Sequence, residues 1–317
     1  MKYRKQLPQL QNQVCLTDGG LETVLIFQKG MDLPEFAAFT LLDRPDGEET
    51  FTTYLDDYIE IARKHEFGLL LESPTWRSNS DWGQKLGYDD KALDAIDQKA
   101  IGVLERIRRE RETGTSPMPI SGCIGPRGDG YSPSAMMSVT EATNYHRRQV
   151  RAFGESAADL ITGLTMTYAD EAIGLTQAAQ SAEIPIAISF TVETDGRLPS
   201  GERLAAAIEH CDAETNGYAS YFMINCAHPT HFRETVEQLG DAALRLGGVR
   251  ANASKMSHEE LDNAEQLDRG CAEELASDMM DLRGLAPHLN VVGGCCGTDH
   301  EHIAQMAASL REETADR

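Results

Sequence analysis

The sequence predicts a single (β/α)8 barrel, the α/β fold also called a TIM barrel, over residues 1–317. Short β-like runs alternate strictly with longer helical patterns, and such alternation requires a parallel sheet. Eight runs can be counted, which favours closure into a barrel over an open doubly wound sheet. Polar motifs follow the strands at nearly every strand-to-helix junction, and in a barrel these junctions share one rim.

The predicted strands are short apolar runs bounded by turn-forming residues. The fifth, at 185–190, is apolar without alternation, as expected of a strand that is buried on both faces. In chain order, the strands are expected at 14–17, 68–71, 119–123, 160–165, 185–190, 221–225, 244–251 and 290–292.

The predicted helices carry apolar residues at the spacing of one helix face. The clearest is 89–112, with Leu93, Ile96 and Ala100 on one side, and Ser138 or Thr140 is a candidate cap for another. The polar, acidic segment 252–269 is the longest ambiguous segment and could form a lid or rim loop. The helices are expected at 50–64, 89–112, 140–156, 170–182, 202–213, 229–239, 271–283 and 300–310.

Composition narrows the class of partner. The net charge is −22 and the sequence pI is about 4.7, so the chain repels phosphate backbones and no nucleic acid partner is expected. The same charge could attract a cationic small substrate, although solubility alone explains it. No apolar stretch is long enough to span a membrane, and the polar N-terminus is not a secretory signal. We expect a cytoplasmic protein, for which a homo-oligomer is compatible with the sequence.

The seven cysteines are an odd number, which indicates reduced thiols rather than a disulfide framework. Cys15, Cys211 and Cys271 lie in strand or helix patterns and are expected to be small buried hydrophobic residues. Cys123 ends the third predicted strand beside glycines, and its role is undecided.

Two adjacent cysteines, Cys295 and Cys296, follow the last predicted strand within Gly293-Gly294-Cys295-Cys296-Gly297-Thr298. Consecutive strand residues point to opposite faces, so both sulfurs can reach one ion only if the chain leaves the strand there. The glycines allow such a turn. A vicinal redox pair, or two buried thiols beside a tight turn, would give the same local pattern.

A third cysteine, Cys226, lies at the end of the sixth predicted strand. The ends of strands six and eight share one rim of a closed barrel, so three thiolates can converge without close spacing in the sequence. Three protein ligands with an open position are typical of a catalytic zinc site, where a substrate thiol is deprotonated. His228 could replace one thiolate, although a histidine before Pro229 at a helix start is often only a cap.

Four motifs carry a family resemblance: Asp18-Gly19-Gly20-Leu21-Glu22-Thr23, Gly122-Cys123-Ile124-Gly125-Pro126, Ile224-Asn225-Cys226 and Gly293-Gly294-Cys295-Cys296-Gly297-Thr298. Together they resemble the homocysteine S-methyltransferase family over nearly the whole chain. The resemblance implies a TIM barrel and a zinc ion on Cys226, Cys295 and Cys296. It also implies methyl transfer to a thiol such as homocysteine, as in methionine biosynthesis.

The resemblance gives Asp18 a role in holding the amino group of the acceptor, and Gly19, Gly20, Glu22 and Asn225 are further candidates for substrate binding. The alternative for the first of these motifs is an Asp-Gly-Gly that only stabilises a turn.

The chain departs from the family pattern after the fourth strand. Where the family has a glutamate that binds the acceptor's ammonium, this chain has Leu164. An ammonium without a partner in a buried site would cost about 1–3 kcal/mol. Glu72, at the end of strand two, could supply the missing charge. Alternatively, the acceptor is a small thiol that lacks an amino group, or the alignment is off by a few residues.

The second-strand motif also differs from the family pattern. Trp76 or Trp82 could face a cationic methyl donor through a cation–π contact, although both could equally be packing aromatics on the rim. Arg77 could bind a substrate carboxylate. No dinucleotide fingerprint or Walker A sequence occurs. The predicted barrel uses the whole length of the sequence, so no appended cobalamin or folate module is expected to carry the methyl group. A free onium compound, such as S-methylmethionine or betaine, is therefore expected as the donor.

The sequence thus predicts a zinc-dependent S-methyltransferase that moves a methyl group from a small onium donor to a metal-bound thiol. One alternative is a zinc-dependent demethylase or lyase that acts on another methylated sulfur compound. The other is a non-catalytic barrel that binds a metal or a thiol, and only Leu164 favours it.

Overall fold

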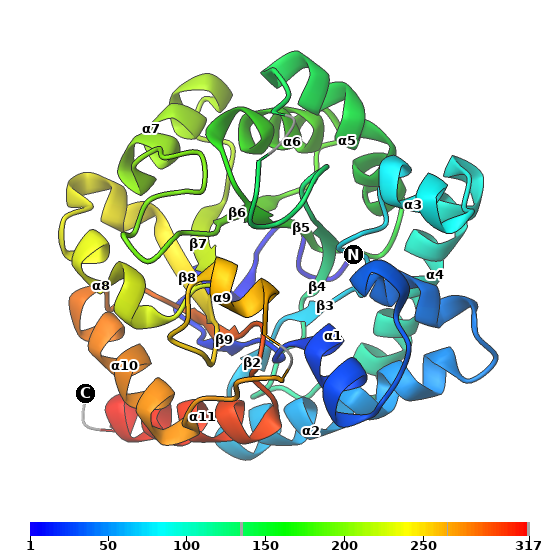
Figure 1. Cartoon of the computed structure of the whole chain (residues 1–317). Coiled ribbons are helices and arrows are strands. Elements are labelled where there is room, and N and C mark those ends of the chain that lie inside the picture. The colour runs from blue at the N-terminus through cyan, green and yellow to red at the C-terminus, as the bar shows by residue number, and fades with distance from the viewer. Residues whose placement is uncertain (134–135, 265, 316–317) are drawn as a thin grey trace.

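The computed structural model describes residues 1–133, 136–264 and 266–315 and shows a ring of strands inside a ring of helices (Figure 1). In these described ranges, nine parallel strands follow the order β2-β1-β9-β8-β7-β6-β5-β4-β3. Only Leu70 separates β2 (Gly68–Leu69), which pairs with β1, from β3 (Leu71–Glu72), which pairs with β4. The continuous segment 68–72 therefore closes the ring. The predicted barrel is confirmed, and its second strand is divided in two.

The remaining strands lie where apolar runs predicted them, with small differences at their ends. Each is buried along nearly its whole length, as expected for the inner layer of a barrel. They are β1 (Cys15–Leu16), β4 (Ile120–Ile124), β5 (Leu160–Met166), β6 (Ile186–Phe190), β7 (Tyr221–Asn225), β8 (Leu246–Ala251) and β9 (Val291–Gly294).

The helices that follow the strands have one buried and one exposed face. At α5, Ser138 is the cap and forms a reciprocal capping box with Glu141, so the helix begins at Val139. The long outer helices are α2 (Gly47–His65), α4 (Asp90–Arg111), α5 (Val139–Gly154), α6 (Ala169–Ser181), α7 (Leu204–Thr215), α8 (Pro229–Glu237), α10 (Ala272–Leu285) and α11 (His300–Ala315).

Several short elements were not predicted, because none is long enough to show an apolar period. The helix α9 lies within 252–269, the ambiguous segment that could form a lid or rim loop. The short elements are α1 (Leu21–Thr23), α3 (Ser80–Leu86) and α9 (His258–Asp262), a π-helical turn at Val24–Gln28, and 3-10 turns at Pro8–Leu10, Pro34–Phe36, Ala38–Asp43 and Gly240–Arg245.

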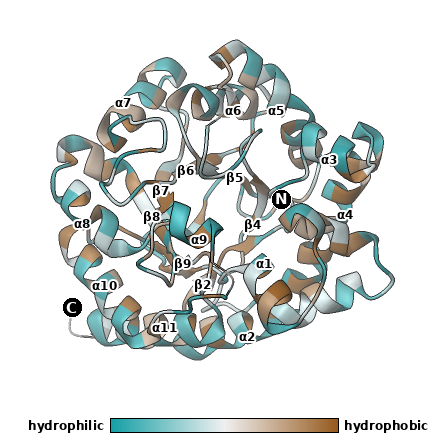
Figure 2. Cartoon of the chain, viewed as in Figure 1, coloured by the Kyte–Doolittle hydropathy of each residue, from teal (hydrophilic) through white to brown (hydrophobic). Residues whose placement is uncertain are grey.

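The two ends of the barrel differ. At the amino-terminal ends of the strands, Leu7 packs in a small apolar cluster with Leu160, Tyr221 and Val291, so the first residues of the chain plug that end. At the other end the hydrophilic helix α9 lies across the mouth (Figure 2). The site described below lies under α9, where the strands end. No helix in the described ranges is long and apolar enough to cross a membrane.

Candidate metal centre

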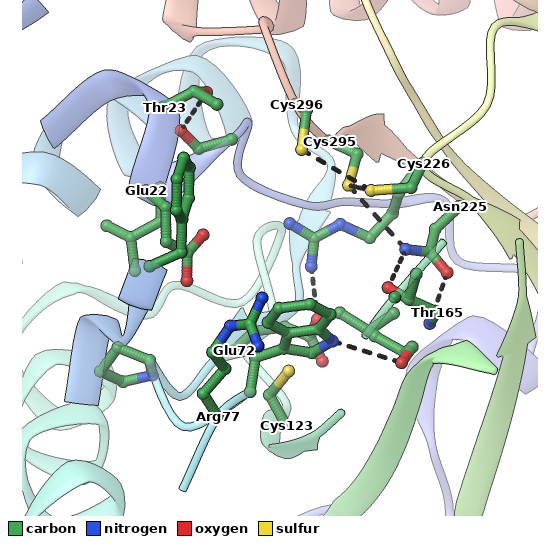
Figure 3. Close-up of a pocket in the computed structure, with 18 of the residues that line it drawn as sticks. Glu22, Thr23, Glu72, Arg77, Cys123, Thr165, Asn225, Cys226, Cys295 and Cys296 are labelled. Atoms are coloured by element: carbon green, nitrogen blue, oxygen red, sulfur yellow. Dashed lines mark hydrogen bonds and ion pairs between the residues drawn. The ribbon is translucent and has the colours of Figure 1, made fainter. Parts of the chain in front are cut away.

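Three cysteine side chains meet at the carboxyl-terminal rim of the barrel (Figure 3). Cys226 follows β7, whereas Cys295 and Cys296 follow β9, and all three sulfurs lie within 4.8 Å of one another. Cys226 Sγ is 3.7 Å from Cys296 Sγ, close to the spacing of about 3.8 Å between thiolates on a tetrahedral zinc ion. Cys226 Sγ and Cys295 Sγ are 2.6 Å apart and would separate on binding an ion. Three soft thiol donors fit zinc.

The backbone presents these sulfurs by leaving regular strand geometry. Cys226 has a φ of 56°, in the left-handed region that side chains other than glycine seldom adopt. As predicted, the chain leaves the strand at Cys295, because β9 ends at Gly294 and a turn follows with Gly297 at a φ of 80°. Thr298 closes this turn by donating from its backbone N and its Oγ1 to the carbonyl of Cys295.

A buried arginine lies beside the cysteines. Arg250, on β8, donates through Nε to the carbonyl of Gly294 at 3.0 Å, through Nη2 to Asp18 Oδ1 at 2.6 Å, and through Nη1 to Glu72. Tyr54 donates to the other oxygen of Asp18 at 3.0 Å. Burial raises the pKa of Asp18 to about 6, although Arg250 opposes this shift. Asp18 and Glu72, two predicted candidates, thus share one cation that sequence reasoning missed.

A cavity of about 200 Å³ opens beside the three cysteines. Figure 3 shows the sulfurs on one side, with Glu22, Glu72 and Arg77 across from them. Burial raises the pKa of Glu22 to about 7. The predicted candidates for metal and substrate binding line this one cavity: Asp18, Gly19, Gly20, Glu22, Glu72, Asn225, Cys226, Cys295 and Cys296.

Comparison with known proteins agrees with this arrangement. The model of the homocysteine S-methyltransferase family matches residues 15–310. The chain belongs to this family. The family predicted from the motifs is therefore confirmed.

Solved structures of family members share the fold. The oxidized form of the homocysteine methyltransferase MmuM from Escherichia coli superposes with a TM-score of 0.75 and 20% identity, over 94% of this chain and 97% of that one. Its metallated form gives 0.74 and 19%, over 96% and 99%. Methionine synthase from Mycobacterium leprae is 26% identical in an alignment over 296 residues that covers 84% of this chain and 21% of that protein. The chain thus spans about a fifth of that relative.

In this homocysteine S-methyltransferase family member, several predicted candidates are already engaged within the protein. The amide of Gly20 donates to the carbonyl of Thr298 at 3.0 Å, so this N–H group already has a partner within the protein. Asn225 Oδ1 accepts from the amide of Thr165 and from Ser189 Oγ, and its Nδ2 lies 3.8 Å from Cys295 Sγ. Asn225 therefore stands beside the metal centre with most of its hydrogen bonds made.

Two residues near the cysteines were missed by sequence reasoning. The hydroxyl of Tyr131 lies 3.7 Å from both Cys226 Sγ and Cys296 Sγ. Its ring stacks on His258 of α9, with centroids 4.0 Å apart, and His258 Nε2 is 2.7 Å from the carbonyl of Cys226. The acidic segment thus brings His258 over the metal centre, as a rim element would.

The two tryptophans both pack against Arg77. The guanidinium of Arg77 lies 3.9 Å from the ring centroid of Trp82 and 4.8 Å from that of Trp76. Trp82 is not among the residues that line the cavity, which fits the alternative of a packing aromatic on the rim. Trp76 does line it, and its Nε1 donates to the carbonyl of Leu164 at 3.3 Å.

The structure also places the other cysteines and His228 that the sequence singled out. Cys15 and Cys211 are buried as expected, but Cys271 is exposed because it is the N-cap residue that precedes α10. Cys123 is buried and lines the cavity, and burial raises the pKa of its thiol well above its ordinary value. His228 caps α8 through Nδ1, which accepts from the amide of Thr230. It is not one of the clustered ligand groups.

Proposed function

We propose that this chain is a zinc-dependent S-methyltransferase that moves a methyl group from a small onium donor to a thiol such as homocysteine. The observation that carries the proposal is the meeting of three sulfurs, from Cys226, Cys295 and Cys296, at the edge of a cavity on the barrel rim. A zinc ion held there would bind the acceptor's sulfur in its remaining position and keep it as a nucleophilic thiolate.

The reaction that this site would support is a direct displacement. The acceptor sulfur forms a bond to the methyl carbon, and the bond from that carbon to the donor's sulfonium sulfur or quaternary nitrogen breaks. The electron pair of the broken bond stays on the donor, which leaves as a neutral sulfide or amine, and the thiol proton is released to solvent. S-methylmethionine and betaine are donors of this class.

The protein's part is to hold and orient the reactants. Tyr131 and Asn225 contact the cysteine sulfurs and keep them in place. Glu22 and the surrounding acidic groups favour a cationic donor in the cavity, because a buried negative charge attracts an onium group.

The test is metal content together with product analysis. Purified under reducing conditions, the protein should hold about one zinc ion per chain. Cys295→Ala should lose it while keeping its far-UV circular dichroism. The zinc-loaded protein, given homocysteine with S-methylmethionine or betaine, should form methionine. A folded protein without metal, or a zinc-loaded protein that methylates no thiol with any onium donor, would refute the proposal.

A further inference from the structure

The cavity holds a carboxylate oxygen that lacks the partner its burial demands. Glu72 lines the cavity with its side chain 4% exposed. Its Oε2 accepts from Arg250, but Oε1 is buried and makes no hydrogen bond with any group in the described residues. A buried carboxylate oxygen without a donor is costly, so such an oxygen in a cavity indicates a ligand that supplies a donor.

The charges around Glu72 point to a cationic donor. Asp18 and Glu72 are buried carboxylates, and Arg250 is the cation between them, so the three together carry one excess negative charge. Buried charges are normally neutralised by a partner. An ammonium group that donates to Glu72 Oε1 would complete this neutralisation. Tyr54 is already bonded to Asp18 and brings no charge.

The position of this group suits an acceptor whose sulfur lies at the cysteines. The guanidinium of Arg250 donates at one side to the carbonyl of Gly294, which directly precedes Cys295, and at the other side to Glu72. Glu72 and the metal centre are thus separated by roughly one arginine head group. Leu164, on another wall of the cavity, is apolar and offers no charge.

The second unpartnered group in the cavity has the opposite charge. Arg77 forms no hydrogen bond or ion pair in the described part of the chain, and its Nε and Nη1 are buried without a partner. Stacking on Trp76 and Trp82 fixes the plane of the guanidinium. A planar, fixed guanidinium is suited to a carboxylate.

We infer that Glu72 and Arg77 determine the specificity of the acceptor subsite: Glu72 binds the ammonium of the thiol substrate and Arg77 binds its carboxylate. The inference rests on the proposed function, and it selects an α-amino acid thiol over a thiol that lacks either charged group. Glu72 would thereby compensate for the apolar side chain at position 164.

The test is a panel of ligands measured by titration calorimetry on the zinc-loaded enzyme. Homocysteine has both groups, 4-mercaptobutanoate lacks the ammonium, and 3-aminopropanethiol lacks the carboxylate. Each truncated thiol should bind about 10-fold to 150-fold more weakly, the range for a lost charged hydrogen bond. The S-methyl thioethers of these three thiols, of which methionine is the first, form a second panel that can bind without a bond from sulfur to the metal. If this second panel shows the selectivity but the thiols do not bind, only the proposed metal chemistry is contradicted.

Variants assign the groups. Glu72→Gln keeps an oxygen for Arg250 and should weaken homocysteine at least tenfold while leaving 4-mercaptobutanoate unchanged. Arg77→Gln should likewise weaken homocysteine at least tenfold while leaving 3-aminopropanethiol unchanged. Exposed Glu49, on α2, gives the matched control Glu49→Gln, which should keep full selectivity.

Three results would overturn the inference. The first is equal binding of 4-mercaptobutanoate and homocysteine by the unaltered enzyme, which needs no variant to fold. The second is loss of the ammonium preference in Glu22→Gln but not in Glu72→Gln, which would make Glu22 the ammonium site. The third is an unchanged preference for the carboxylate in Arg77→Gln.

Discussion

Arg250 is the residue whose replacement should most strongly affect stability. Its guanidinium is 7% exposed and pairs with Asp18 and Glu72, whose side chains are 8% and 4% exposed. The variant Arg250→Met has a side chain of similar length but no charge. Both carboxylates then remain buried without their cation, although Tyr54 still donates to Asp18.

Two estimates bound the expected loss in the free energy of unfolding. Removing one partner of a buried ion pair costs about 3–5 kcal/mol. A carboxyl group can limit its penalty by taking up a proton, which costs about 4 kcal/mol at pH 7 for an ordinary pKa near 4. With two carboxylates affected, the free energy of unfolding should fall by about 4–8 kcal/mol at pH 7, a large part of the total for most domains.

Urea unfolding at two pH values tests both the size and the cause. Because the folded variant takes up protons that the unfolded chain releases near pH 4, its stability rises as the pH falls. The deficit relative to the unaltered protein should therefore shrink by about 1–4 kcal/mol between pH 7 and pH 5. The control Arg106→Met removes a half-exposed partner of Glu48 and should cost below about 1 kcal/mol. A deficit below about 2 kcal/mol, or one that is equal at both pH values, would refute the reasoning.

Three further changes have defined outcomes. Burial raises the pKa of Asp97 to about 7, so its stabilising contribution is full below pH 4 and is lost as the pH rises through 7. Asp97→Asn should therefore make the melting temperature less dependent on pH between pH 4 and pH 7. Ser138→Ala removes the capping box of α5 and should lower the urea-unfolding free energy by about 1 kcal/mol, and an unchanged value would contradict the cap. A Cβ on Gly294 would lie 2.0 Å from Thr298 Oγ1, so Gly294→Ala should weaken zinc binding at least tenfold in a chelator competition, without loss of helical content.

The barrel could be predicted because its strands and long helices leave strong periodic patterns. The apolar run at 221–225 was predicted with its observed bounds, since every residue of β7 is buried. The helices α3 and α9 have seven and five residues, too few for an apolar stripe to repeat. The division of the second strand at Leu70 depends on neighbours from β1 and β4, which no local pattern reveals.

The meeting of the cysteines was also predictable, because strand ends in a closed barrel share one rim. Arg250 was missed because one charged residue within an apolar strand does not say which face it occupies. A basic residue just before a strand end is a signal that could have found it. Tyr131 lies on a loop whose path is set by contact with α9, so its distance to the cysteines follows only from the folded chain.

The seam between β1 and β9 gives the metal centre a dependence on the completed fold. Cys15 pairs with Val291, residues 276 positions apart, and the turn that carries Cys295 and Cys296 packs directly on Gly20. Contacts this distant in sequence carry a high closure cost and tend to form late. The three thiols come from β7 and β9, which β8 joins directly, but the turn that carries two of them rests on Gly20 only when the first and last strands are joined. An ion bound at this site would therefore link the end of β7 to the turn after β9, and the seam with β1 would hold that turn in place.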